Sequence, residues 1–185
     1  ENKYKDAIQS FSTAVKVDPT NAKAYFARGL SHQQLNEKSK AISDFQKSLS
    51  IDPKMDRAYF SIGSIQLESK NYNEALKNFT KDLELRPDNP ETNFKIGETY
   101  HEMKSFSNAS NYYQKTLKNE PNHYQAYFNL GLINQQKKSY NEAVQLFEKA
   151  ASIRGGDAAS FYEIGKAYEG QNNDIKAIEY YEKAI

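Results

Sequence analysis

The sequence predicts an all-α fold of stacked helix–turn–helix units, and three observations lead to this prediction. The pentapeptide YNEAL at 72–76 returns as YNEAV at 140–144, 68 residues later. Glycine, alanine, aromatic and proline residues recur at half that interval, every 34 residues, without insertion or deletion. Between the prolines, apolar residues follow the 3.6-residue period of amphipathic helices. A fixed period of this length is typical of proteins whose repeats pack only on their neighbours.

Four series of residues keep one register along the chain. The glycine series is Gly29, Gly63, Gly97, Gly131 and Gly165, and the alanine series is Ala7, Ala41, Ala75, Ala109, Ala143 and Ala177. The aromatic series is Phe11, Phe45, Phe79, Tyr113, Phe147 and Tyr181, and the proline series is Pro19, Pro53, Pro87 and Pro121, followed by Gly155. Glycine within a helix costs about 1 kcal/mol relative to alanine. We therefore expect two helix backbones to cross too closely for a larger side chain, with alanine opposite glycine and the ring beyond the crossing.

This register defines each element in order. Residues 1–21 contain only the second helix of a unit and its exit turn. Four complete units follow, and a partial unit stops inside its second helix; their bounds are 22–55, 56–89, 90–123, 124–157 and 158–185. The sequence thus predicts a single array over residues 1–185. Its last segment, EYYEKAI, does not resemble such an end and suggests a piece of a longer solenoid, because end repeats normally carry a polar outer face.

The helix bounds follow from periodicity, caps and proline. In the unit 56–89, the apolar stripes predict helices over 56–69 and 73–85. Proline closes each unit because it cannot continue a helix. Good N-caps precede the next helix, at Asn21, at Asn89 before Pro90, and at Asp157.

The pattern resembles the tetratricopeptide repeat, a 34-residue helix–turn–helix family. That family has a bulky residue at position 4, an apolar one at 7, Gly at 8, a ring at 11, Ala at 20, a ring at 24, a small residue at 27 and Pro at 32. Counted from Tyr124, this chain has Tyr127, Leu130, Gly131, Asn134, Ala143, Phe147, Ala150 and Gly155 at those positions. The resemblance spans the chain, with departures at Arg28, His32, Gln66, Asp82 and Asn134. It implies a right-handed α-α superhelix with the first helices on the concave face.

The resemblance also implies a partner-binding groove, formed mainly by positions 2, 5, 9, 12 and 13 of the first helices. Position 5 is aromatic throughout. Two interpretations of these rings stay open: they anchor an extended or helical peptide, or they pack against the next repeat. The candidate partner-binding residues are Lys23, Phe26, Leu30, Gln33, Arg57, Phe60, Ser64, Leu67, Glu91, Phe94, Glu98, His101, Gln125, Phe128, Leu132, Gln135, Tyr162 and Lys166.

Charge changes along this set of residues. Lys23 and Arg57 stand in the early repeats, whereas Glu91, Glu98 and Glu102 gather in the middle. A groove that is basic at one end and acidic in the middle would orient a charged peptide. The alternative is that these are ordinary solvated side chains.

Two binding functions known in this family require particular residues at fixed positions of the repeat. The clamp that holds chaperone C-terminal carboxylates uses Lys at position 5 with Asn and basic residues nearby, but position 5 is never Lys here. A carboxylate needs several converging donors, so the clamp is excluded in this segment. The array of the protein O-GlcNAc transferase resembles a ladder of Asn at position 6; this chain has Ala27, Ser61, Lys95, Asn129 and Glu163 there, with one Asn only.

No motif for catalysis, a cofactor or a metal emerges. The chain has no Cys, no phosphate-binding glycine loop, and three histidines without ligand spacing. The segment 152–160 could offer backbone N–H groups to an anion, but it is better explained as a flexible replacement for the missing proline turn. With 25 Lys and Arg against 24 Asp and Glu, the net charge of +1 gives no field that would attract nucleic acid or an anionic membrane. Absence of an apolar run of roughly 18 residues argues against a membrane span, so we expect an intracellular, cytoplasmic protein, with a cilium as one location suggested by family habit.

The sequence therefore predicts a non-catalytic protein–protein interaction scaffold, without cofactors, that binds a peptide segment of a partner in its groove. It would belong to a longer chain and a multiprotein complex. One alternative is a structural segment embedded in a large assembly, such as a ciliary or transport complex, with the groove unused. Another is the targeting domain of an enzyme, such as a protein glycosyltransferase, encoded elsewhere in the chain.

Overall fold

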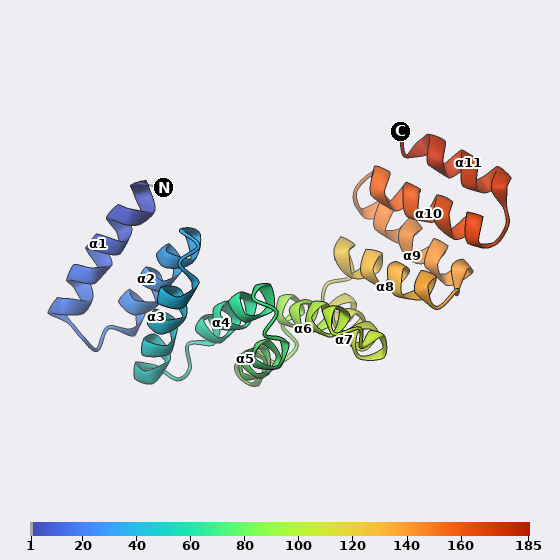
Figure 1. Cartoon of the computed structure of the whole chain (residues 1–185). Coiled ribbons are helices and arrows are strands. Elements are labelled where there is room, and N and C mark those ends of the chain that lie inside the picture. Colours follow the sequence, from blue (N-terminus) through green and yellow to red (C-terminus); the bar gives the residue numbers. More distant parts are fainter. Residues whose placement is uncertain (1) are drawn as a thin grey trace. The chain divides into compact units, whose positions relative to one another are not determined.

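The computed structural model describes residues 2–185, and within them every regular element is a helix (Figure 1). The all-α class is thereby confirmed. The helices are α1 (Asn2–Val17), α2 (Ala22–Gln34), α3 (Lys38–Ile51), α4 (Asp56–Glu68), α5 (Tyr72–Leu85), α6 (Pro90–Glu102), α7 (Phe106–Asn119), α8 (Tyr124–Gln136), α9 (Tyr140–Ile153), α10 (Ala158–Gly170) and α11 (Asp174–Lys183).

The chain divides into two compact units, unit 1 (Glu1–Pro87) and unit 2 (Asp88–Ile185). In unit 1, α2 pairs with α3 and α4 with α5, while α1 packs on α2 and α3 on α4. In unit 2 the pairs are α6 with α7, α8 with α9 and α10 with α11; α7 packs on α8 and α9 on α10. Each first helix thus forms a hairpin with the second helix that follows it. The single array over 1–185 stays a prediction.

The helices begin at the side-chain caps that the sequence indicates. Asn21 Oδ1 accepts a hydrogen bond from the Ala24 amide at 3.0 Å, and Asn89 and Asp157 cap α6 and α10 in the same way. An additional cap is His123, whose Nδ1 accepts from the Ala126 amide at 3.2 Å. Histidine does not stand out as a cap in a sequence, because only one tautomer of the neutral ring can accept at Nδ1.

The turn inside each hairpin has one left-handed residue. These residues are Asn36, Lys70, Lys104, Lys138 and Asn172, with φ between 57° and 61°. The next residue donates its amide back to a carbonyl in the last turn of the first helix, as Ser139 does to Asn134 at 2.9 Å. This 6→1 bond is the Schellman closure that ends a helix. A repeated turn conformation therefore fixes the direction in which each second helix returns.

The core consists of rings packed directly onto the helical glycines. A Cβ built on Gly29 would lie 2.7 Å from Phe45 Cε1, and one on Gly131 would lie 2.5 Å from Phe147 Cε1. Phe45, Phe79, Tyr113 and Phe147 have no exposed surface, and Tyr181 is partly buried. The expected order of groups is therefore corrected: the ring of the second helix, rather than an opposing alanine, occupies the space that glycine leaves. The alanine series is buried from Ala41 to Ala177.

Polar residues at two apolar positions of the repeat are paired. The Arg28 guanidinium donates to both carboxylate oxygens of Asp44, at 2.8 and 2.6 Å, and to Ser12 Oγ at 3.2 Å. The hydrogen bonds that the guanidinium donates to Asp44 raise the pKa of Arg28 above its ordinary value. His32 joins the same group, with Nδ1 2.5 Å from Glu37 Oε2. Arg28 and His32, which depart from the family pattern, thus pair with Asp44 on α3 and with Glu37 directly before it.

Candidate protein-binding surface

The position-5 rings lie on the first helices and pack inside their own hairpins. Each ring contacts the ring of the paired second helix, at centroid distances of 5.4 Å (Phe26–Phe45), 5.8 Å (Phe60–Phe79), 5.5 Å (Phe94–Tyr113), 5.4 Å (Phe128–Phe147) and 5.5 Å (Tyr162–Tyr181). Phe94 is 8% exposed, whereas Tyr162 is 52% exposed. The rings are therefore core residues to different degrees. Their ring partner belongs to the same repeat, and Phe26, Phe94 and Phe128 also pack in core clusters that include residues of the next first helix.

The other predicted partner-binding residues fall into two groups by exposure. The exposed ones are Lys23, Leu30, Arg57, Glu91, Gln125 and Lys166; the partly buried ones are Gln33, Ser64, Leu67, Glu98, His101, Leu132 and Gln135. Lys23 to Leu67 lie on α2 and α4 of unit 1, and Glu91 to Lys166 lie on α6, α8 and α10 of unit 2. Their role in binding a partner stays a prediction. All of them lie on first helices of the hairpins.

A polar cluster joins α6, α7 and α8 around the Tyr113 hydroxyl. That oxygen accepts a hydrogen bond from Asn129 Nδ2 at 3.2 Å and lies 3.5 Å from His101 Nδ1. Burial, followed by the negative charge of Glu98, raises the pKa of Tyr113, and Glu102 adds to the effect. Asn129 is a residue of this surface that the candidate set omits. The sequence feature that could indicate this cluster is Tyr113 itself. Most residues of the aromatic series are phenylalanine, so a tyrosine there suggests that its hydroxyl has a polar partner.

Tyr181 forms a comparable cluster between α10 and α11. Its hydroxyl donates to Glu169 Oε2 at 2.7 Å. Burial and this carboxylate raise the pKa of Tyr181 to about 12, with a smaller contribution from Glu163. Both tyrosines of the series thus lie near two glutamates carried by the first helix of their own hairpin.

The first helices of unit 2 carry more negative than positive side chains at these positions. Lys95 pairs with Glu98 at 2.7 Å, and on α10 the Lys166 ammonium pairs with Glu163 at 3.0 Å. Glu91 and Glu102 on α6 form no ion pair with any other part of residues 2–185. The acidic character predicted for the middle of the chain therefore includes two carboxylates that remain available to a partner.

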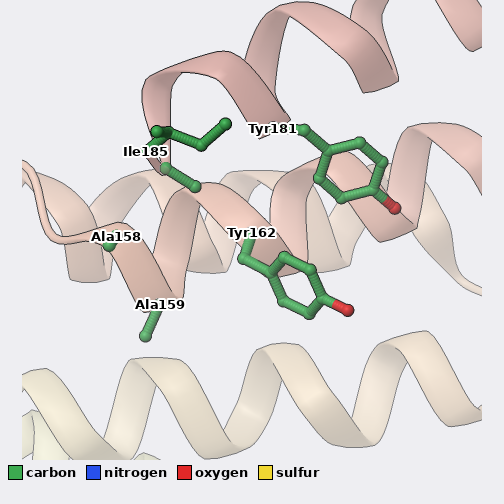
Figure 2. A pocket seen from close by; sticks show the side chains of 6 residues that line it. Ala158, Ala159, Tyr162, Tyr181 and Ile185 are labelled. Atoms are coloured by element: carbon green, nitrogen blue, oxygen red, sulfur yellow. The ribbon is translucent and has the colours of Figure 1, made fainter.

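An apolar hollow of about 650 Å³ lies at the α10–α11 hairpin (Figure 2). It is lined by Ala158, Ala159, Tyr162, Tyr181, Ala184 and Ile185. Figure 2 shows the Tyr162 and Tyr181 rings side by side, with Ile185 at the end of α11 and the two alanines on the first turn of α10. Tyr162 is thus a predicted partner-binding residue that lines an apolar hollow.

The described part of the chain has neither a metal-binding cluster nor a membrane-spanning helix. Residues 2–185 contain no group of three or more His, Cys, Asp or Glu side chains placed to hold a metal ion. None of the helices in this range has the length and apolar character needed to cross a bilayer.

Models of one repeat family match nearly the whole chain. A model described as TPR repeat matches residues 1–36 and 63–104, and models described as tetratricopeptide repeat match 22–55, 90–123 and 122–185. No curated protein sequence matches the chain.

Three solved structures illustrate the fold that this chain shares with known proteins. The chain is 25% identical to YrrB, described as a TPR protein with an unusual peptide-binding site, with 96% of this chain and 92% of that chain covered and a TM-score of 0.80. It is 23% identical to MamA (88% and 89% covered, TM-score 0.81) and 22% identical to PilF of Pseudomonas aeruginosa (97% and 82% covered, TM-score 0.83). Together with the 34-residue register, the glycine–ring packing and the helix hairpins, these matches show that the chain belongs to the tetratricopeptide repeat family.

Proposed function

We propose that this chain is a non-catalytic protein-interaction scaffold whose first helices bind an extended peptide segment of a partner protein. The observation that carries the proposal is the surface of α6 and α8. These helices carry partly exposed rings such as Phe128, the Asn129 and His101 members of the Tyr113 cluster, and two carboxylates, Glu91 and Glu102, that form no ion pair within residues 2–185. A rigid surface that combines apolar anchors with unpaired charge is suited to peptide recognition, because little ordering is needed on the protein side.

The chemistry of this surface favours a peptide with apolar and basic residues. Apolar side chains would contact the exposed edges of rings such as Phe128, and Lys or Arg would meet the free carboxylates of α6. Exposed charge pairs add modest affinity but strongly affect association rate and orientation. The similarity to YrrB, a TPR protein with an unusual peptide-binding site, supports the same class of function for this chain.

The test selects ligands first and then asks which surface they use. Peptides would be selected from a random display library on the purified chain, and their affinities measured by fluorescence anisotropy. For the variant with Glu91→Lys and Glu102→Lys, we expect at least a tenfold loss of affinity. Both side chains are exposed, so the melting temperature should remain close to that of the parent.

The control reverses two charges elsewhere in unit 2. Glu120, which caps α7, and Glu142, in the first turn of α9, are exposed and lie outside the first helices. The variant with Glu120→Lys and Glu142→Lys has the same net charge as the test variant and should bind the selected peptides normally. If no peptide is enriched, or if both variants bind equally well, the first-helix surface is not the binding site.

A further inference from the structure

The turn between α9 and α10 differs from the other turns that join successive repeats. Two consecutive residues, Gly155 and Gly156, have φ of 70° and 90°, in the left-handed region that favours glycine. The three preceding turns have larger residues at these positions, namely Pro53 and Lys54, Pro87 and Asp88, and Pro121 and Asn122. Ala151, on the last turn of α9, likewise stands where those repeats have Leu49, Leu83 and Leu117. Three neighbouring positions therefore have smaller side chains here than in the preceding repeats.

A cavity of about 320 Å³ lies beside these small residues, between α9, α10 and α11. We call it the turn cavity; Ala151, both glycines, and the rings of Phe161 and Tyr180 line it. A Cβ built on Gly155 would have no atom within 4 Å, so the space beside the turn is open. In the preceding repeat, Leu117 packs against the core cluster of its own hairpin. The turn cavity is thus lined at positions where the earlier repeats carry a leucine and a proline.

Contacts between three helices hold the rings of the turn cavity in place. The centroids of Phe161 and Tyr180 are 6.2 Å apart. The Tyr180 hydroxyl donates to Glu148 Oε1 at 3.1 Å, and the Lys183 ammonium lies 4.3 Å from the Tyr180 ring centroid. A Cβ on Gly156 would lie 3.3 Å from Phe161 Cε2, so this ring packs on the backbone of the turn. The cavity is therefore formed before any ligand binds, which lowers the cost of ordering.

The size and the edge of the turn cavity define the chemistry of its occupant. Ligand sites begin at roughly 300 Å³, so this cavity suits a single apolar side chain better than a large ligand. Glu148 and Lys183 stand at its edge. Lys183 pairs with Glu179 at 2.6 Å, whereas Glu148 forms no ion pair within residues 2–185. An apolar cavity beside an unpaired carboxylate is complementary to an aliphatic residue with a basic neighbour.

We propose that the turn cavity binds a leucine side chain of a partner protein, with an adjacent arginine or lysine of that partner paired to Glu148. The bound leucine replaces the apolar group that Leu117 supplies within its own repeat. The turn cavity shares no residue with the predicted partner-binding residues of the first helices. This proposal and the proposed function can therefore fail independently.

The probe is the tetrapeptide acetyl-Ala-Leu-Arg-Ala-amide, titrated into the 15N-labelled 185-residue chain. We expect saturable changes in the NMR chemical shifts of the Gly155 and Gly156 amides. The same peptide with alanine in place of leucine should cause no saturable change at these amides, because it lacks the side chain that fills the cavity.

Ala151→Leu tests the site by filling the cavity from within. The three preceding repeats have leucine at this position, so the variant should fold and its melting temperature should not fall. Its affinity for the probe should be at least tenfold lower. Ser107→Leu, which adds the same side chain on the exposed side of α7, should leave the affinity unchanged.

Glu148→Gln tests the charge at the edge of the cavity. The glutamine amide oxygen can still accept the hydrogen bond from Tyr180, so the rings should stay in place. Affinity for the probe should fall about threefold, as expected for the loss of an exposed ion pair. A peptide with glutamine in place of arginine should bind the parent and the variant equally. The chain with Glu91→Lys and Glu102→Lys should bind the probe normally, which separates this test from that of the first-helix surface.

Three results would overturn the proposal. The first is no saturable change at the two glycine amides. The second is unchanged affinity of a folded Ala151→Leu variant, since the leucine would then bind elsewhere; if that variant does not fold, unchanged affinity of Glu148→Gln has the same consequence. The third is a change in the glycine shifts with protein concentration in the absence of peptide, which would identify a second copy of the chain as the occupant.

Discussion

Some polar residues inside the hairpins are stabilised by a partner on the other helix of the same hairpin. Arg28 is the clearest example, because it stands where the family has an apolar residue, and Asp44 on α3 is 6% exposed. Two hydrogen bonds from the guanidinium to this carboxylate satisfy a charge that would otherwise be buried alone. A buried pair of this kind contributes little net stability compared with two apolar residues, but removing one partner is costly.

Arg28→Leu should therefore destabilise the protein even though leucine restores the family pattern. We expect a loss of about 3 kcal/mol in the free energy of unfolding, because Asp44 is left without its main donor. The measurement is urea unfolding followed by circular dichroism.

The double variant with Arg28→Leu and Asp44→Leu tests the cause of that loss. Replacement of both charges by apolar groups should recover most of the stability, since no unpaired charge remains. If the double variant is as unstable as the sum of the two single variants, packing of the arginine side chain, rather than its charge, is the important factor.

At the scale of the element, the repeated hairpin turn determines where each second helix starts. A left-handed residue stands in every such turn, and an L-residue other than Gly, Asn or Asp pays roughly 1 kcal/mol or more in this conformation. Asn occupies it at Asn36 and Asn172, whereas lysine occupies it at Lys70, Lys104 and Lys138. Asparagine tolerates this region better because its short polar side chain bonds locally. The lysine turns are therefore less well matched to their conformation than the asparagine turns of the same chain.

Lys138→Asn should stabilise the hairpin of α8 and α9. The expected gain is about 0.5 kcal/mol, which a thermal melt can detect as a small rise in melting temperature. Lys137→Asn is the matched control: this neighbouring lysine has φ of −79° and is also exposed. It should bring no gain. If the melting temperature rises equally in both variants, the cause is the loss of positive charge and not the left-handed conformation.

At the scale of the whole molecule, the sequence is most informative where a residue type has one physical use. Proline ends helices and Asn21, Asn89 and Asp157 begin them, so the helix bounds are predictable to within about a residue. The side chain that packs on each helical glycine is harder to predict. Periodicity shows that a small residue is needed there, but it does not identify the neighbouring group that fills the space. The Tyr113 cluster was missed for a similar reason: its members come from three helices, and their proximity depends on side-chain direction.

Each unit has its own core, and this leads to a prediction for the separated units. Residues 88–185 include two core clusters, around Tyr113 and around Phe147, whose members all lie within α6 to α11. A repeat array is stabilised mainly by nearest-neighbour contacts. We therefore expect the fragment 88–185, which keeps the Asn89 cap, to fold with full helical content and a cooperative melt. The measurement is circular dichroism at 222 nm with temperature.

The matched control is the fragment 106–185, which begins at α7 and lacks α6. Without that helix, Phe94 no longer covers the Tyr113 ring, and the Gly97 backbone no longer contacts it. The helix α7 should therefore fray. The fragment should then lose more helical signal than the deletion of residues 88–105 accounts for. Equal helicity per residue in both fragments would show that the hairpin is not the smallest cooperative element of this chain. The glycine–ring contact would then contribute less to stability than its close packing indicates.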